Sequence, residues 1–329
     1  MKVDKEKINR ALVITLSNVG DAVLTLPVID ALAAGLPRAR IDVLAAPGVM
    51  DIFEHDPRVS KVFMYDKRSG IFEKYRLIKK LRGMGYDIVV DLKNTFIPIL
   101  LLSRYRTAVF RPVKGIMHKR DEHLLRISGI GFNTDSACFV FPILEDEKDN
   151  ADRLLGEAFG GREFVIVNPG AKSCLKRWPA DRYAGLCDRI IGELHLGVAI
   201  VGSNQGRANP NSDRFVADNV IKAMKEKAGD FVGKTGMGEL AHLMKNAKAV
   251  VTNDSGPLHV ASAVNTPTVA VFGPTDEAKY GPLADSSVVV RENIECAPCG
   301  KARCVRAHEC LNNISVDRVF SPLKKICGF

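Results

Sequence analysis

The sequence lacks any apolar run long enough to cross a membrane. Its longest candidate, 96–102, has seven residues and contains a proline, whereas a spanning helix needs about 20 apolar residues. The first ten residues, MKVDKEKINR, are mostly charged or polar, where a signal peptide would have an apolar segment. We therefore expect a cytoplasmic protein, and neither absence prevents it from binding a membrane surface.

Two nucleotide-binding motifs are also missing. The loop after the first apolar run contains a single glycine, Gly20, so the G-x-G-x-x-G fingerprint of dinucleotide-binding proteins is absent. The segment GDFVGKTGMGEL imitates a P-loop, but Gly229 and Gly233 are separated by three residues, where the P-loop requires four. The sequence therefore predicts neither a dinucleotide-dependent dehydrogenase nor a P-loop ATPase.

Negative charge is scarce between Lys61 and Arg126, where 16 Lys and Arg residues face 6 Asp and Glu. Such a region suits an anionic partner: a phosphorylated glycan, a lipid headgroup surface or nucleic acid. Nucleic acid fits worst, because the region has no helix-turn-helix, RNP or zinc-finger pattern and few aromatic residues. A solvated lysine-rich helix face, with Lys74, Lys79 and Lys80, is the alternative explanation.

A chain of 329 residues exceeds what one hydrophobic core usually spans, so two domains are expected. Strand-like runs alternate with helical stretches in both halves, a rhythm that predicts parallel sheets covered on both faces. We predict an α/β protein with two Rossmann-like doubly wound domains facing a cleft, at 8–145 and 160–329, joined by an acidic linker at 146–159. The predicted strands are 11–16, 41–45, 61–65, 87–91, 107–110, 164–167, 198–201, 249–252 and 268–272.

Two strand–loop–helix segments carry the most information. In the later one, an apolar run ends at Asn253, and Asp254 or Ser255 can cap a helix with Pro257 in its first turn. The free N–H groups of that helix start suit a phosphate, although an ordinary βα loop is the alternative. In the earlier segment, Asp21 stands at the mouth of the first βα crevice, where open parallel sheets bind ligands, unless it only caps its helix.

Three segments occur in the order LSNVGDAVLTLP, NPGAKSCLKRWP and NDSGPLHVASAVNTPTVAVFGPTD. Together they resemble the signature segments of glycosyltransferase family 9, the heptosyltransferases that build the inner core of lipopolysaccharide. The similarity spans roughly Ala11 to Tyr280. It implies a GT-B fold, with the acceptor bound mainly by the first domain and ADP-heptose mainly by the second.

The resemblance assigns roles to residues of this sequence. Asp21 matches the family's catalytic base, and Lys176 matches a lysine that contacts the donor phosphates. The donor-binding residues that it implies are Ser173, Lys176, Gly202, Thr235, Gly236, Asp254, Ser255, Gly256, Pro257 and His259. For the acceptor, the basic region and the first loop suggest Asn18, Lys93, Asn94, Arg104 and Arg111.

We therefore expect an inverting transfer of heptose from ADP-heptose to a lipopolysaccharide core acceptor at the inner face of the cytoplasmic membrane. No D-x-D pair, the usual signature of metal-dependent transferases, occurs, so helix N–H groups and Lys176 would have to balance the leaving diphosphate. The alternatives are a GT-B enzyme that epimerises or hydrolyses a nucleotide sugar, and a non-catalytic binder of anionic glycan or lipid.

Four of the eight cysteines are concentrated in one short segment, at 296, 299, 304 and 310. In a cytosolic protein, such spacing favours a metal over disulfides. Cys296, Cys299, Cys304 and Cys310 are thus candidate ligands of a structural zinc, with His308 as a substitute and an iron–sulfur cluster as a weaker option. Reduced or disulfide-paired cysteines are the other possibility.

Overall fold

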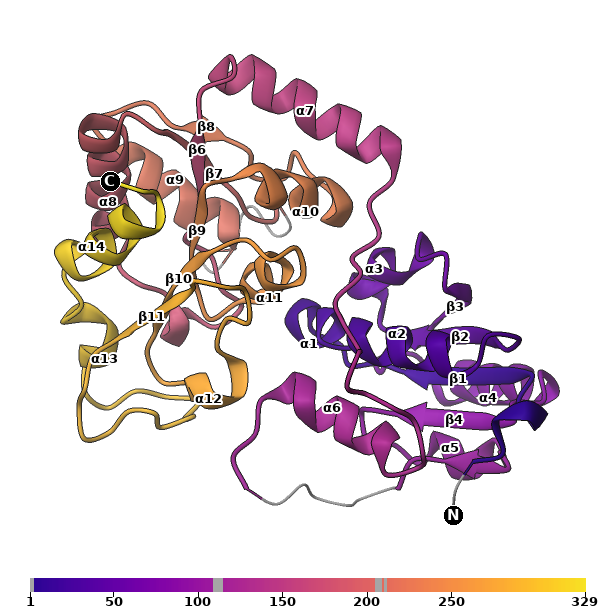
Figure 1. Ribbon diagram of the computed structural model, residues 1–329. Coiled ribbons are helices and arrows are strands. Elements are labelled where there is room, and N and C mark those ends of the chain that lie inside the picture. Colours follow the sequence, from indigo (N-terminus) through magenta and orange to yellow (C-terminus); the bar gives the residue numbers. More distant parts are fainter. Residues whose placement is uncertain (1–2, 109–114, 205–208, 210–211) are drawn as a thin grey trace. The chain divides into compact units, whose positions relative to one another are not determined.

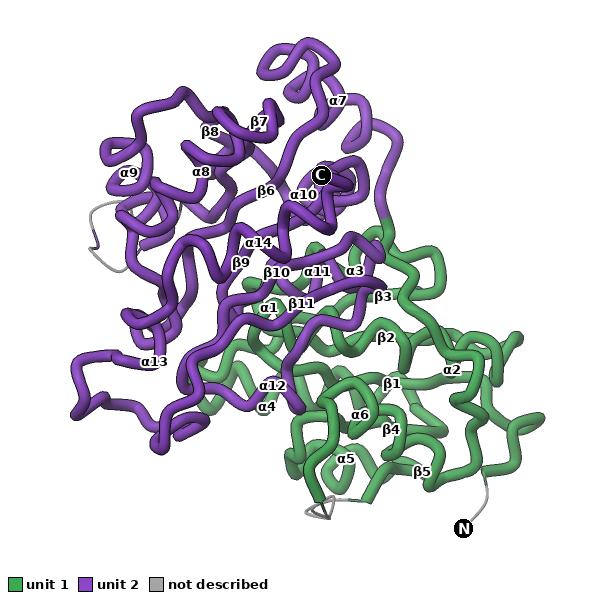
Figure 2. Tube along the Cα trace, turned by 60° about the vertical axis from the view of Figure 1, so that its left-hand side comes forward, with its two compact units in different colours: residues 1–142 green, residues 143–329 purple. Residues whose placement is uncertain are grey.

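The computed structural model describes residues 3–108, 115–204, 209 and 212–329. The chain divides into two compact units, 1–142 and 143–329 (Figure 2). Each unit contains its own parallel sheet (Figure 1). No helix in the described ranges is long and apolar enough to span a bilayer.

Unit 1 contains a five-stranded sheet in the order β3-β2-β1-β4-β5, in which every pairing is parallel. The central strands β1 and β4 are almost continuous apolar runs, because helices cover both faces of such a sheet. The elements of unit 1 are η1 (Lys5–Lys7), β1 (Arg10–Ile14), α1 (Val19–Val23), α2 (Leu26–Gly35), β2 (Arg40–Ala45), η2 (Pro47–Val49), α3 (Asp51–Glu54), β3 (Val59–Met64), α4 (Ile71–Gly83), β4 (Ile88–Asp91), α5 (Ile97–Leu100), β5 (Tyr105–Arg106) and α6 (Lys119–Ser128).

Helices α4 and α5 cover one face of the first sheet. Leu81 of α4 and Ile97 of α5 are buried in one cluster with Leu12 and Val89 of the strands. Helices α2 and α6 pack against each other, and α2 also contacts β2. This sandwich leaves the carboxyl ends of the strands, and the loops that follow them, free to carry polar groups.

Unit 2 contains a six-stranded parallel sheet in the order β11-β10-β9-β6-β7-β8. Its elements are α7 (Glu145–Phe159), β6 (Phe164–Asn168), η3 (Cys174–Lys176), α8 (Ala180–Leu194), β7 (Gly197–Ile200), α9 (Asp213–Ala223), β8 (Gly229–Asp230), α10 (Met237–Asn246), β9 (Ala249–Asn253), α11 (Gly256–Ala263), β10 (Thr268–Phe272), α12 (Glu277–Tyr280), β11 (Val288–Arg291), α13 (Glu309–Asn312) and α14 (Val316–Ile326).

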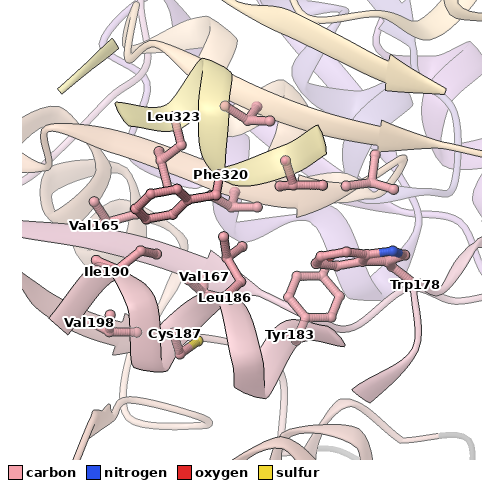
Figure 3. Close-up of a cluster of buried hydrophobic side chains, with 14 of the residues drawn as sticks. Val165, Val167, Trp178, Tyr183, Leu186, Cys187, Ile190, Val198, Phe320 and Leu323 are labelled. Atoms are coloured by element: carbon pink, nitrogen blue, oxygen red, sulfur yellow. The ribbon is translucent and has the colours of Figure 1, made fainter. Parts of the chain in front are cut away.

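The core of unit 2 lies between its sheet and helices α8 and α14 (Figure 3). Trp178 packs edge-on against Tyr183 with ring centroids 5.0 Å apart, and its indole N–H donates to the Ile314 carbonyl at 3.0 Å. Phe320 and Leu323 of α14 complete the layer over Val165 and Val167. The single tryptophan is therefore part of the hydrophobic core of unit 2.

The predicted linker at 146–159 forms most of a 15-residue helix, as its helix-prone sequence favours, and this helix belongs to unit 2. Helix α7 packs along α10, Ala151 is fully buried, and the Phe159 ring stacks on Phe164 and Phe231 at 5.3 and 5.9 Å. This packing could not be predicted from the acidic sequence, because only one residue of the helix is fully buried.

In both sheets the strand order reverses at the first strand of the unit. Strand β1 lies between β2 and β4, and β6 lies between β7 and β9. The connections on the two sides of such a strand run in opposite directions, which opens a crevice at its carboxyl end where α/β proteins bind ligands. This position is called a topological switch point. The loops after β1 and β4, and those after β6 and β9, are therefore the places to look for a site.

Candidate active site

In unit 1, the loops after β1 and β4 are joined by a hydrogen bond, which Lys93 Nζ donates to Ser17 Oγ at 2.8 Å. Asp21 lies beside this contact, as the third residue of α1. Its carboxylate accepts a bond from Asn18 Nδ2 at 3.1 Å, and neither side chain caps the helix with a bond to its backbone. Asp21 is therefore a half-buried carboxylate at a switch point, with room for a further proton donor.

Lys93 is held firmly at this position. Its backbone N–H donates to Asp91 Oδ1 at 2.8 Å, and its ammonium lies 5.3 Å from the centre of the Tyr65 ring. Burial, and then the nearby charge of Lys67, lower the pKa of Lys93, while burial raises the pKa of Asp91. The lysine is thus a partly desolvated cation on the loop that bonds Ser17, four residues before Asp21.

Asn94 adopts a left-handed backbone conformation, with φ of 58°, and its side-chain oxygen accepts a bond from Arg126 Nη1 at 2.7 Å. Arg126 comes from α6 and also bonds Glu122 at 3.2 Å. No sequence pattern indicated Arg126, because its partner Asn94 is 32 residues away. Asn18, Lys93 and Asn94 thus stand on the two loops of this switch point, as predicted for the acceptor side.

Arg104 does not join this group. It precedes β5, whose first residue pairs with Ile88 at the amino end of β4, and its guanidinium lies over the Tyr105 ring at 5.3 Å. The structure thus places Arg104 apart from Lys93, because proximity in sequence does not fix the edge of the sheet at which a residue emerges, and its role toward the acceptor stays a prediction. Arg111, also predicted for the acceptor, lies outside the described residues.

A buried histidine secures the helix that carries Asp21. His123 of α6 bonds the carbonyl of Leu24, directly after α1, through Nδ1 at 3.3 Å. Burial lowers the pKa of His123 to about 4, so the ring is neutral at physiological pH. The position of Asp21 thus depends on a side chain 102 residues further along the chain.

In unit 2, the predicted donor residues Lys176 and Asp254 form an ion pair, with Nζ and Oδ2 2.6 Å apart. The Asp254 side chain is only 6% exposed, whereas that of Lys176 is 34% exposed and lies 6.0 Å from the centre of the Tyr280 ring. The carboxylate holds the lysine in place and leaves part of the ammonium open to solvent.

A network of short polar side chains joins the same two loops. Asn168, the last residue of β6, donates through Nδ2 to Ser255 Oγ and Thr252 Oγ1, each at 3.0 Å. Asn253 accepts the Trp178 N–H at 3.0 Å and donates to the Pro169 carbonyl at 2.9 Å. These asparagines were not predicted, although each is a polar residue directly after an apolar strand.

Helix α11 begins at Gly256, directly after Ser255, so its first N–H groups point toward the position that Lys176 also borders. Pro257 supplies no N–H, and His259 is buried, 4% exposed, inside the same helix. Ser173 also lies close to this group, because its carbonyl accepts the Lys176 N–H at 3.1 Å. The structure therefore brings the predicted phosphate-binding residues together.

Three further predicted donor-binding residues, Gly202, Thr235 and Gly236, follow β7 and β8, farther along the same edge of the sheet. Gly202 accepts the Gly233 N–H at 2.8 Å, which ties these two loops together. The Gly236 N–H is already bonded to Glu239 at 2.7 Å, so Gly236 cannot offer that donor to a ligand. The contacts of Gly202 and Thr235 with a nucleoside stay predictions.

The four clustered cysteines line one small pocket together with His308. Cys304 Sγ accepts backbone N–H groups from Arg306 at 3.4 Å and from His308 at 3.3 Å. Within 3–108, 115–204, 209 and 212–329, no three cysteine, histidine or carboxylate side chains converge closely enough to hold a metal ion. The structural zinc therefore stays a prediction from the spacing of Cys296, Cys299, Cys304 and Cys310.

Comparisons with known proteins show the family of the chain. The family model described as glycosyltransferase family 9 (heptosyltransferase) matches residues 99–309. Lipooligosaccharide heptosyltransferase 2 of Haemophilus influenzae is 30% identical over 318 residues, which cover 85% of this chain and 88% of that relative.

Two solved structures share the fold over nearly the whole chain. The ADP-heptose LPS heptosyltransferase II of Escherichia coli has a TM-score of 0.78 and 25% identity, and the match covers 97% of this chain and 98% of that one. A family 9 glycosyl transferase from Veillonella parvula has a TM-score of 0.84 and 22% identity, with 99% and 98% covered. The predicted α/β architecture of GT-B type, with two Rossmann-like domains, is confirmed.

Proposed function

The chain belongs to glycosyltransferase family 9, and from this membership we propose that it transfers heptose from ADP-heptose to a sugar of the lipopolysaccharide inner core, with inversion at the anomeric carbon. Its relatives are named for heptose transfer to lipooligosaccharide or lipopolysaccharide, and one solved relative is named for ADP-heptose. The observation that carries the proposal is the Lys176–Asp254 pair at the start of α11, because it offers a cation and helix N–H groups to one diphosphate.

On the acceptor side, Asp21 is the base. An inverting transfer requires a carboxylate that removes the proton of the attacking hydroxyl while the nucleotide diphosphate leaves from the opposite face of the sugar. The Asp21 carboxylate already accepts one N–H bond, from Asn18, which orients it. Lys93 and Asn94 on the neighbouring loop can then bind the anionic or hydroxyl groups of the acceptor.

On the donor side, charge builds up on the diphosphate as the glycosidic bond breaks. Lys176 and the first N–H groups of α11 are fixed before the reaction begins, so they stabilise that charge without reorganisation. This arrangement supplies what a divalent cation supplies in transferases with a D-x-D pair. We therefore propose that transfer requires no added metal.

The metal prediction has a direct test. Dialysis against EDTA should leave the rate of transfer within about twofold of that of untreated enzyme, because Lys176 and backbone N–H groups carry the leaving charge. A strict requirement for added Mg²⁺ or Mn²⁺ would show that this account of the diphosphate is wrong.

The donor and the reaction class are tested together by analysing products. The chain should consume ADP-heptose only when a core acceptor is present, and should use UDP- and GDP-sugars poorly or not at all. Release of free heptose without acceptor would favour a hydrolase, and a change of heptose stereochemistry with ADP retained would favour an epimerase.

We also propose that the protein works as a peripheral protein at the inner face of the cytoplasmic membrane. Its proposed acceptor carries a lipid anchor, and the basic region between Lys61 and Arg126 suits an anionic leaflet. Fractionation of cells should recover the protein partly with membranes at low salt and in the soluble fraction at high salt.

A further inference from the structure

Exposed apolar side chains are concentrated in one part of unit 1. Fifteen large apolar residues are exposed in the described chain, and eight of them lie between Met64 and Leu102. Single exposed apolar residues are ordinary, but a contiguous group on a monomer usually marks an interaction surface.

Helix α4 presents the most exposed of them in its first turn and a half. Ile71, Phe72 and Tyr75 are 76%, 78% and 65% exposed. Leu81 is the only fully buried residue of the helix, and Leu77 and Ile78 pack partly against the same core. The apolar residues at the start of α4 thus face away from the sheet.

Basic residues continue the same outward face along α4. Ile71, Tyr75, Lys79 and Arg82 follow one another at spacings of four, four and three residues, which places them along one side of a helix. Arg76 stands one turn after Phe72 on the adjoining side. The helix carries five basic residues and one acidic residue.

These cations are not compensated by the protein itself. Among the residues that the structure describes, Arg76, Lys79 and Arg82 form no ion pair, and their side chains are exposed. A row of uncompensated cations next to exposed apolar and aromatic side chains matches a bilayer interface, where headgroup phosphates lie beside acyl chains.

Helix α5 extends this surface. It contacts α4, and its first residue Ile97 and the following Leu101 are buried in the core cluster to which α4 also contributes. Its other residues, Ile99 and Leu100, are 44% and 51% exposed, and Leu102 follows at 65%. Two neighbouring helices on one face of the sheet therefore both present apolar side chains to solvent.

We propose that the outward face of α4, continued by α5, is the surface by which unit 1 docks on an anionic phospholipid bilayer. Ile71, Phe72 and Tyr75 enter the headgroup region, and Arg76, Lys79 and Arg82 pair with lipid phosphates. Helix α4 starts after β3, and Asp21 follows β1, so both stand at the carboxyl edge of the same parallel sheet. This inference rests on the proposed function only in expecting a lipid-anchored acceptor.

The test is flotation of the purified full chain with vesicles. Phosphatidylethanolamine vesicles that contain phosphatidylglycerol should bind it, and phosphatidylcholine vesicles should not. The triple variant Arg76→Gln/Lys79→Gln/Arg82→Gln should bind the anionic vesicles on the order of a hundredfold more weakly, at about fivefold for each cation. The variant Ile71→Ser/Phe72→Ser/Tyr75→Ser should bind the anionic vesicles at least about tenfold more weakly, because each serine buries less apolar surface in the bilayer than the side chain it replaces.

A matched control uses exposed residues of the same kinds at the other end of the chain. The variant Lys324→Gln/Lys325→Gln/Phe329→Ser should bind vesicles as the wild type does. Undiminished binding by the two α4 variants would overturn the proposal, and so would equal binding of the wild type to neutral and anionic vesicles. If the two α4 variants lost self-association but still bound vesicles, the proposal would also be overturned, and the face would be an interface between protein chains.

Activity separates this inference from the proposed function. With an acceptor stripped of its acyl chains, the α4 variants should keep wild-type rates, while on acceptor embedded in anionic vesicles they should be slower in proportion to their lost binding. Equal losses on both acceptors would assign these side chains to the acceptor site and would overturn the docking surface. If the wild-type chain bound vesicles but had no transferase activity, the docking surface would be supported and the proposed function would be refuted.

Discussion

One oxygen of the Asp21 carboxylate accepts a hydrogen bond from Asn18, and the side chain does not cap a helix. A change in turnover on substituting Asp21 therefore reports on its role in the reaction. We expect Asp21→Asn to lower kcat on the order of 10²- to 10⁴-fold, the usual value of general-base catalysis, and to leave the Kd of ADP unchanged. Single-turnover rates and calorimetric titration with ADP measure the two quantities. Asn18→Ala, which keeps the Asp21 carboxylate, should lower kcat much less than Asp21→Asn. Near-normal turnover of Asp21→Asn would remove Asp21 from the mechanism.

Lys176 and Asp254 should differ in their effects, although they form one pair. Lys176→Ala should weaken ADP binding roughly tenfold to a hundredfold and slow transfer, since it removes a charge-assisted bond to the diphosphate. Asp254→Asn removes a negative charge near the diphosphate but also the anchor of the lysine, so kcat should fall while ADP binding stays the same or tightens. Parallel losses of ADP affinity in both variants would argue against Asp254 as a positioning residue.

His123 links the acid stability of unit 1 to the helix that bears Asp21. Its folded pKa, about 4, lies below the ordinary value of 6.5, so the unfolded chain takes up a proton first as the pH falls. Stability from this residue is complete above about pH 7 and is lost between about pH 6.5 and pH 4, with about 2 kcal/mol gone by pH 5. Denaturant unfolding of wild type and His123→Gln at pH 7.5 and pH 5 should therefore show a smaller pH difference in the variant. An equal pH difference in both would show that His123 is not the residue responsible.

At the scale of single residues, local patterns predicted the site where the chemistry of one loop sufficed. Ser255 and Asp254 follow a strand and open a helix, so the local pattern indicated them, whereas Lys176 was identified only through the resemblance to glycosyltransferase family 9. The distance of Arg104 from Lys93 and the contact of Arg126 with Asn94 were not foreseen, because both depend on which edge or which helix a distant part of the fold provides.

At the scale of elements, the basic loops of unit 1 should make acceptor binding sensitive to salt. Raising the ionic strength to about 0.5 M shortens the Debye length to a few ångströms, so the KM of the acceptor should rise steeply while donor binding changes little. Lys93→Ala should flatten that response. Arg104→Ala is the matched control, because Arg104 emerges at the opposite edge of the sheet, and it should keep the wild-type salt response. Equal salt sensitivity for both substrates would mean that the basic region is only a solvated surface.

The strands were predicted where apolar runs are long and buried on both faces, as in β1, β4, β6 and β9. Strand β8 was missed, since it has two residues that read as part of a glycine-rich turn. Strand β11 was missed although it contains three valines, because it is an edge strand with a single neighbour and is not followed directly by a helix. Helix α7 was taken for a linker because its packing partner, α10, is far away in sequence.

At the scale of the whole molecule, unit 2 holds a complete sheet, its own core and all the predicted donor residues. We expect an isolated chain of residues 143–329 to fold cooperatively and to bind ADP within about tenfold of the affinity of the full protein, without transferase activity. Circular dichroism and calorimetry measure both properties. Aggregation of this fragment, or loss of ADP binding with the fold intact, would show that unit 1 contributes to the donor site.

The Asn168 network has an evolutionary consequence. Most site residues stand on loops, where a substitution can change the substrate without disturbing a sheet. Asn168 is both the last residue of a central strand and the donor of bonds to the turn before α11. A change there alters the ligand loop and removes one hydrogen bond from each of the Thr252 and Ser255 hydroxyls at the same time. Among descendants of this chain that acquire new donors, drift should therefore be rapid at Ser173 and Thr235 and slow at Asn168.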